Sequence, residues 1–163
     1  MSVLFITPQE ITNTTILGGN VDVDKYIFTI ENVQKSVIEP LLGTELYDVI
    51  YDGASTGNLT GDYLELYTKF VKPITKNSAL GEYIEIASLI VSNGGVFKHA
   101  PDNAEIASET ETQTLADRYH AAAQLDINRF EKWICKHDIS EYKRVQDEVN
   151  ATNVSTRTGW YFG

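Results

Sequence analysis

Three histidines and one cysteine are the side chains of this 163-residue chain best suited to bind a metal or to act as a nucleophile and its base. Cys135 and His137 are two residues apart in a predicted helix, so they point to roughly opposite sides and cannot share a ligand. His120 lies seventeen residues before His137 on the same predicted helix, and His99 falls in a predicted loop. We therefore expect structural or solvated histidines and no bound metal.

One acidic stretch has the spacing of a calcium-binding EF-hand loop. Asn20, Asp22 and Asp24 alternate along the chain, and Glu31 stands at the twelfth position of such a loop. However, the sixth position requires glycine for a sharp turn, and here it is Lys25. The apolar periodicity of the same stretch predicts a helix instead, whose N-terminus favours acidic residues. We expect no calcium site.

The remaining patterns that could support catalysis are incomplete. Glu82 and Glu85 share one side of a predicted helix, but a di-iron bundle also needs the motif Glu-x-x-His twice, and the sequence does not contain it. Gly18-Gly19 and Gly94-Gly95 lack both the Lys-Ser/Thr of a P-loop and the three-glycine spacing of a dinucleotide site. We expect no cofactor and no enzymatic activity.

Charge and composition exclude several other classes of protein. The formal net charge is −10 and the pI is about 4.6, which argues against a nucleic-acid binder, since such a protein needs a basic footprint, and disfavours binding to an anionic membrane. No apolar run approaches the length of a membrane span. Hydrophobic residues make up 42% of the chain, which suffices for a core, and a single cysteine fits a reducing compartment.

Helix signals begin close to the N-terminus. Thr7–Glu10 forms a capping box with proline at the first helical position, which predicts a short helix to about Leu17. A second amphipathic helix is predicted to end near Leu41. Its apolar residues recur at three-and-four spacing and comprise Val23, Tyr26, Ile27, Ile30, Val33, Val37 and Leu41.

The middle of the chain predicts three more helical segments. Thr44 should cap a short helix through about Tyr51, and a polar loop should follow at 53–61. A helix from about residue 60 to 71 should kink or break at Pro73. The segment 74–91 is apolar on almost every face, which is typical of a central helix surrounded by others.

The C-terminal part predicts an acidic loop from Val96 to Ser108 and then a long helix from about Thr110 to Asp138. The apolar stripe of this helix is Ala116, Tyr119, Ala123, Ile127, Phe130 and Ile134. The whole pattern predicts an all-α helical bundle of four to five main helices, with extended N- and C-terminal arms.

Both ends of the chain are predicted to contact other proteins. Residues 149–163 form a small-polar tail after a bundle domain at 1–148, and the tail cannot bury itself. It closes on three adjacent aromatic residues, which are Trp160, Tyr161 and Phe162. The apolar arm at the other end comprises Val3, Leu4, Phe5 and Ile6. The alternative for the tail is that it folds back onto its own domain or frays.

Four segments resemble a small family of tailed-phage and prophage proteins related to the head–tail connector, or adaptor, proteins. The segments are Ile38–Tyr47, Asn93–His99, Phe130–Cys135 and the closing Gly159–Phe162. The resemblance extends over the whole chain, and its segments carry no chemistry of their own. It implies a helical subunit of a virion.

This resemblance implies a homo-oligomeric ring, typically of twelve copies, beneath the portal protein at the neck of the virion. Such a ring links the portal to downstream tail or neck proteins, and DNA only passes through it. The chain would be found in the virion, and in the host cytoplasm during assembly. By analogy with connector rings, the two ends of the chain would contact neighbouring subunits or the portal, with the loop 93–108 as a further contact element.

Two other classes of function remain open from the sequence. One is a soluble bacterial adaptor or inhibitor that uses the same tail on a different partner. The other is a metal-dependent enzyme with a site in the core of the bundle.

Overall fold

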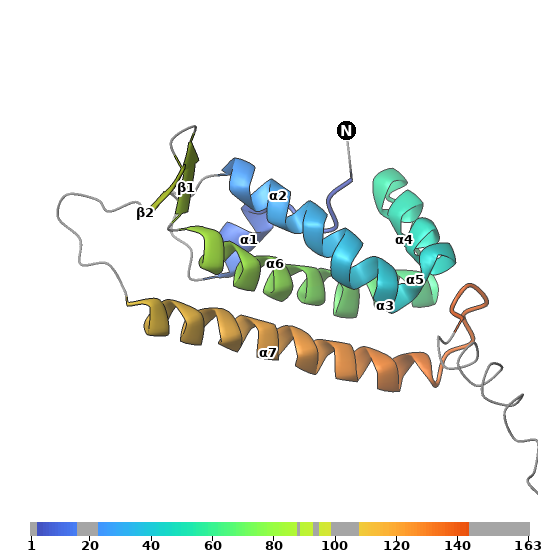
Figure 1. Ribbon diagram of the computed structural model, residues 1–163. Coiled ribbons are helices and arrows are strands. Elements are labelled where there is room, and N and C mark those ends of the chain that lie inside the picture. Colours follow the sequence, from blue (N-terminus) through green and yellow to red (C-terminus); the bar gives the residue numbers. More distant parts are fainter. Residues whose placement is uncertain (1–2, 16–22, 88, 93–94, 99–107, 144–163) are drawn as a thin grey trace, which may run out of the picture.

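The computed structural model describes residues 3–15, 23–87, 89–92, 95–98 and 108–143. These residues form an all-α helical bundle, which confirms the predicted fold class, with a small two-stranded hairpin at one end (Figure 1). In chain order the elements are α1 (Pro8–Thr14), α2 (Val23–Val33), the π-helix η1 (Gln34–Ile38), α3 (Glu39–Leu42), α4 (Thr44–Thr56), α5 (Gly61–Leu66), the π-helix η2 (Tyr67–Val71), α6 (Lys72–Ala87), β1 (Leu89–Ser92), β2 (Gly95–Lys98) and α7 (Glu109–Ile134).

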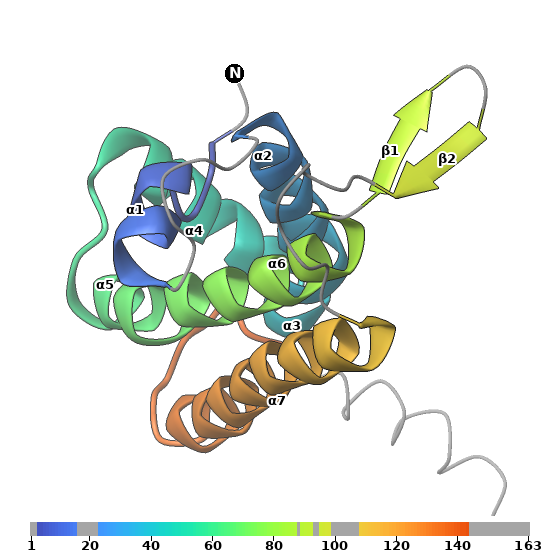
Figure 2. The ribbon, with the colours of Figure 1, turned by 90° about the vertical axis from the view of Figure 1, so that its left-hand side faces the viewer.

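Helix α6 is the central helix of the bundle, as its sequence predicts. It lies between α2 and α7, and Figure 2 shows the same order after a quarter turn. Its buried residues are Ile74, Thr75, Ser78, Ala79, Leu80, Gly81, Tyr83 and Ile84. The predicted stripe of α7 covers one side, with Ala116, Ala123, Phe130 and Ile134 buried. Among the helices that the structure describes, none is long and apolar enough to cross a membrane.

Two prolines lie inside continuous helical runs. Helical structure continues from residue 23 to 42 and from 61 to 87, so the predicted kink or break at Pro73 does not end the helix. Pro40 and Pro73 each follow the last residue of a π-helix by two positions. Proline lacks the N–H for the hydrogen bond of an α-helix, and its ring clashes with the carbonyl four residues earlier. The wider π turn accommodates this local defect without breaking the helix.

Several helix ends were predicted from caps. The predicted capping box on Thr7 is present at the start of α1, and a second box, which was not predicted, is present on Ser108 at the start of α7. The predicted cap at Thr44 is wrong by one residue, because Gly43, with φ of 76°, occupies the N-cap position. Helix α4 also extends beyond Tyr51 to Thr56, and Leu59, in the loop after it, packs closely over Gly53.

The hairpin corrects the predicted end of the central helix. The sequence predicts helix up to Val91 and a loop from Val96, but both residues lie in antiparallel strands, paired with each other. Asn93-Gly94 separates the two strands in the sequence, and Asn-Gly between apolar runs is the strongest short-range hairpin signal. Figure 2 shows the hairpin projecting from the bundle. Residues 99–107 of the predicted acidic loop lie outside the described residues.

Helices α6 and α7 approach closely where Gly81 faces His120. A Cβ atom built on Gly81 would lie 2.6 Å from Cε1 and 2.7 Å from Nε2 of the His120 ring. The same Nε2 is 3.4 Å from a carboxylate oxygen of Glu85, so the ring is also paired along α6. The absence of a side chain at Gly81 therefore allows the imidazole to lie against the helix.

We predict that this contact makes the effect of Gly81→Ala depend on residue 120. In the wild type the substitution should lower the free energy of unfolding by about 1 kcal/mol, because the ring must move away. In a His120→Ala background it should raise that free energy by roughly 0.5–1 kcal/mol, because alanine favours helix over glycine. Urea unfolding of the four proteins measures the coupling. An effect of Gly81→Ala that is the same in both backgrounds would contradict the contact.

Candidate functional site

The N-terminal arm lies against helices of its own chain. Phe5 is fully buried and Ile6 is 5% exposed, whereas the two residues before them are half-buried. The Phe5 ring meets three tyrosine rings edge-on, at centroid distances of 5.4–6.1 Å, and these are Tyr47, Tyr51 and Tyr67. Aromatic pairs prefer this edge-on arrangement, so the Phe5 ring packs in the core with a specific geometry.

Four hydrogen bonds with side chains satisfy the backbone N–H and carbonyl groups of Val3 and Phe5 in the arm. The Val3 N–H donates to the Tyr51 hydroxyl oxygen at 2.8 Å, and the Tyr67 hydroxyl donates to the Phe5 carbonyl at 2.9 Å. Gln34 makes the other two: its Oε1 accepts from the Phe5 N–H at 2.7 Å, and its Nε2 donates to the Val3 carbonyl at 3.0 Å. The amide of Gln34 thus pairs with the arm as the backbone of a neighbouring strand would.

This arrangement changes the role expected of the arm. The sequence predicts that Val3–Ile6 contacts another subunit, but Phe5 and Ile6 fill the core of their own chain. Both side chains are buried, and both backbone groups of Phe5 are hydrogen-bonded, so these two residues present no surface to a partner. A contact role for Val3 and Leu4, which stay half-buried, remains a prediction.

Helix α1, directly after the arm, is tied to the start of α6 by an ion pair. Lys72 Nζ lies 2.6 Å from a carboxylate oxygen of Glu10. Partial burial alone would raise the pKa of Glu10, but the Lys72 ammonium and the N–H and hydroxyl of Thr7 lower it, and the net result is a pKa below the usual 4.5. The Glu10 carboxylate therefore has two roles. It caps α1 through Thr7, and it holds α1 on the bundle through Lys72.

The other predicted contact residues, Trp160, Tyr161 and Phe162, lie outside the described residues. The predicted boundary between the bundle domain and the tail, at 148/149, lies outside them as well. Their roles stay predictions.

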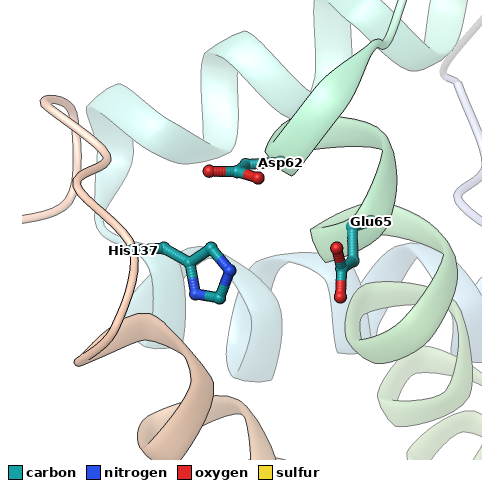
Figure 3. A group of neighbouring side chains, drawn as sticks. All are labelled: Asp62, Glu65 and His137. Carbon is teal, nitrogen blue, oxygen red and sulfur yellow. The ribbon is translucent and has the colours of Figure 1, made fainter.

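A polar cluster lies where α5 meets the segment that follows α7. Asp62, Glu65 and His137 each bring one ligand-type atom within 4.8 Å of the others. Figure 3 shows the imidazole facing the two carboxylates, which project from one helix. Asp62 is exposed, and the other two residues are half-buried. This is a group of side chains that the fold brings together from opposite halves of the chain.

Trp133 positions the imidazole of His137. The two rings are stacked, with centroids 3.8 Å apart and planes at 20°. His137 Nδ1 lies 2.8 Å from the backbone carbonyl oxygen of Trp133. Because a carbonyl can only accept, Nδ1 carries the hydrogen in this bond, and in the neutral ring Nε2 then keeps its lone pair.

Trp133 also contacts the carboxylate of Glu65. One oxygen of Glu65 accepts from Lys69 Nζ at 2.8 Å and from the indole N–H of Trp133 at 3.2 Å. The hydrogen bond from Lys69 lowers the pKa of Glu65 most, desolvation opposes this, and the Trp133 bond and nearby His137 lower it further. Glu65 is therefore held as a carboxylate in a fixed position.

The chain that follows α7 packs back onto the bundle. Ile139 is buried, and the Tyr142 ring lies edge-on to Phe130 with centroids 5.7 Å apart. The Tyr63 hydroxyl donates to Glu141 at 2.8 Å, which links this segment to α5. His137 thus lies on a segment that several contacts hold in place.

The sequence does not reveal this cluster. Asp62 and Glu65 have i,i+3 spacing, which is the only local signal, and His137 follows 72 residues after Glu65. The pair singled out from the sequence, Glu82 and Glu85, is not part of it. The Glu82 carboxylate accepts a hydrogen bond from Asn32, and the Glu85 carboxylate pairs with His120.

A family model described as a family of unknown function (DUF6712) matches residues 38–152, which is more than two thirds of the chain. The chain belongs to this family. The matched range includes three of the four segments that resemble connector proteins, and excludes the arm and the closing aromatic residues. A family without an assigned function neither supports nor contradicts that resemblance. No curated protein and no solved structure matches the chain.

We predict that Gln34 is the main polar anchor of the arm. In Gln34→Leu the buried Phe5 N–H and the partly buried Val3 carbonyl lose their partners, and an unsatisfied buried group costs about 1–3 kcal/mol. Urea unfolding should show a loss of roughly 2–4 kcal/mol. Ser36→Leu, at an exposed position of the same π-helix, is the matched control and should change stability by about 0.5 kcal/mol or less. Equal losses of stability in the two variants would show that the hydrogen bonds of Gln34 are not what anchors the arm.

Proposed function

We propose that this chain is a structural subunit of the head–tail junction of a tailed phage. Many copies would form a ring that links the portal to downstream tail or neck proteins and surrounds the path of the DNA. In this role the chain has no catalytic site, and its function is to make contacts.

The observation that supports this proposal best is that two of the segments resembling connector proteins build the core of the observed bundle. Ile38–Tyr47 includes α3 and the start of α4, and its buried residues are Ile38, Leu42, Leu46 and Tyr47. Phe130–Cys135 closes α7, with Phe130 fully buried. Similar core segments favour a similar fold. Function does not follow from a fold alone, so the proposal has to be tested on assembly.

The closing aromatic residues offer enough surface for a stable contact. Trp160, Tyr161 and Phe162 could together bury roughly 450–750 Å², at about 150–250 Å² for each ring. A standard interface buries about 800 Å² on each partner. The tail could therefore supply more than half of one side of such an interface.

A ring also needs two different contact faces on each subunit, because each copy meets one neighbour on either side. Phe28 on α2 is 63% exposed and Leu125 on α7 is 61% exposed. These helices cover opposite sides of α6 (Figure 1). An exposed large apolar side chain on each of these two helices is consistent with such head-to-tail contacts between copies.

The strongly acidic charge fits a channel that DNA passes without binding. A net charge of −10 disfavours the neutralisation of phosphates, which is what binding to DNA requires. Repulsion between like charges would let the duplex slide.

We predict that the aromatic tail is required for assembly. Wild-type protein should form rings, alone or on the portal of the same phage, in native mass spectrometry. The triple variant Trp160→Ser, Tyr161→Ser, Phe162→Ser should stay a folded monomer with unchanged circular dichroism, because it loses apolar contact area and keeps its core. The variant Thr156→Ser, Thr158→Ser, in the same tail, is the matched control and should assemble normally.

Two results would count against the proposal. Normal ring formation by the triple serine variant would remove the docking role of the tail. A wild-type protein that stays monomeric both alone and with the portal would contradict the ring itself, and would favour an adaptor or inhibitor that acts on another partner.

A further inference from the structure

We propose that Asp62, Glu65 and His137 bind a divalent transition-metal ion, with Zn²⁺ the best fit, where α5 meets the segment after α7. Nothing in the connector proposal requires this site, and the observations that support it are separate.

The spacing of the three groups suits a metal ion. Their ligand atoms lie within 4.8 Å of one another. Zinc binds nitrogen and oxygen ligands at about 2.0–2.2 Å, which places neighbouring ligand atoms about 3–4 Å apart. Closing the group around an ion therefore takes movements of about 1 Å. Rotation of two carboxylates that are exposed or half-buried can provide such movements without a change in the backbone.

The three groups do not satisfy one another directly. Within the described part of the chain, His137 makes no hydrogen bond or ion pair to either carboxylate. By contrast, the other described pairing of this kind, between His120 and Glu85, is direct at 3.4 Å. The side chains of this cluster therefore lie close together without forming a direct ion pair between the imidazole and a carboxylate. Such a pair would be the simplest structural reason for their proximity.

The surroundings of His137 are those of a metal-binding histidine. Such histidines donate one ring N–H to a carbonyl or carboxylate, which fixes the ring and leaves the other nitrogen for the metal. Here Nδ1 lies 2.8 Å from the Trp133 carbonyl, and the ring is stacked on the indole. The indole N–H of the same Trp133 holds Glu65. One residue therefore positions two of the three ligands.

The donor set favours zinc among the common metals. One imidazole nitrogen with two carboxylate oxygens is a mixed set, and imidazole suits zinc and its d-block neighbours better than magnesium or calcium. Three protein ligands leave positions for water, as in sites that are open to solvent. The Lys69 ammonium on Glu65 competes with the ion, so we expect a site of moderate affinity.

A bound ion would join α5 to a segment more than 70 residues later in the sequence. Because the unfolded chain does not hold these ligands together, binding would stabilise the native state. It would also fix the segment from which the C-terminal part of the chain continues.

The test uses full-length protein without an affinity tag, with Cys135→Ser in every version, because an exposed thiol can bind zinc by itself. Calorimetric titration with Zn²⁺ and elemental analysis after dialysis should give one ion per chain. Asp62→Asn, Glu65→Gln and His137→Phe should each weaken binding at least tenfold. Phenylalanine at 137 keeps a ring to stack on Trp133. His120→Gln, outside the cluster, is the matched control and should leave the affinity unchanged.

Thermal unfolding gives a second readout. Zn²⁺ should raise the Tm of the parent protein and of His120→Gln, but not that of His137→Phe. The proposal is overturned if the parent binds no zinc, or if His137→Phe binds it as tightly as the parent. Zinc binding by a protein that forms no ring would leave this site intact and count only against the connector proposal.

Discussion

Because α6 carries apolar or small side chains around most of its circumference, it can be stable in water only between other helices. Helix α2 covers one side, where the rings of Tyr26 and Tyr83 stack with centroids 4.0 Å apart. Helix α7 covers the other, and comes close because Gly81 leaves room for the His120 ring. The π-helix before Pro73 keeps α5 and α6 in one continuous helical run, so the same run that forms the centre also presents Asp62 and Glu65 at its start.

Polar side chains hold two segments against the bundle: the N-terminal arm before α1 and the segment that follows α7. Gln34, carried by the π-helix before Pro40, binds the backbone of the N-terminal arm at both Val3 and Phe5. Trp133, in the last turn of α7, binds Glu65 and supports His137. In both places a buried or half-buried side chain supplies hydrogen bonds that regular secondary structure does not. The fold therefore uses the arm as part of its own core, and it brings together Asp62, Glu65 and His137, which belong to no local motif.

The features that could be predicted from sequence were those set by local patterns. The capping box on Thr7 and the stripe of α7 follow from short-range spacing, and both are confirmed. The hairpin contradicts the predicted helix, because apolar residues continue past Ala87 into the strands, although Asn93-Gly94 is a turn signal. The pairing of Gln34 with the arm and the approach of His137 to α5 depend on contacts between residues 29 to 75 positions apart, which no window of the sequence contains.

The central claim is that this chain is a structural component of a virion, and quantitative mass spectrometry of purified particles tests it most directly. If a phage encodes the chain, its virions would be separated from host lysate, and peptides of this chain would be counted against those of the portal protein. The account predicts that the chain is present in the particles at about the copy number of the portal, because one ring stacks on another. Its absence from intact, infectious particles, with the protein found only in the host lysate, would contradict the account.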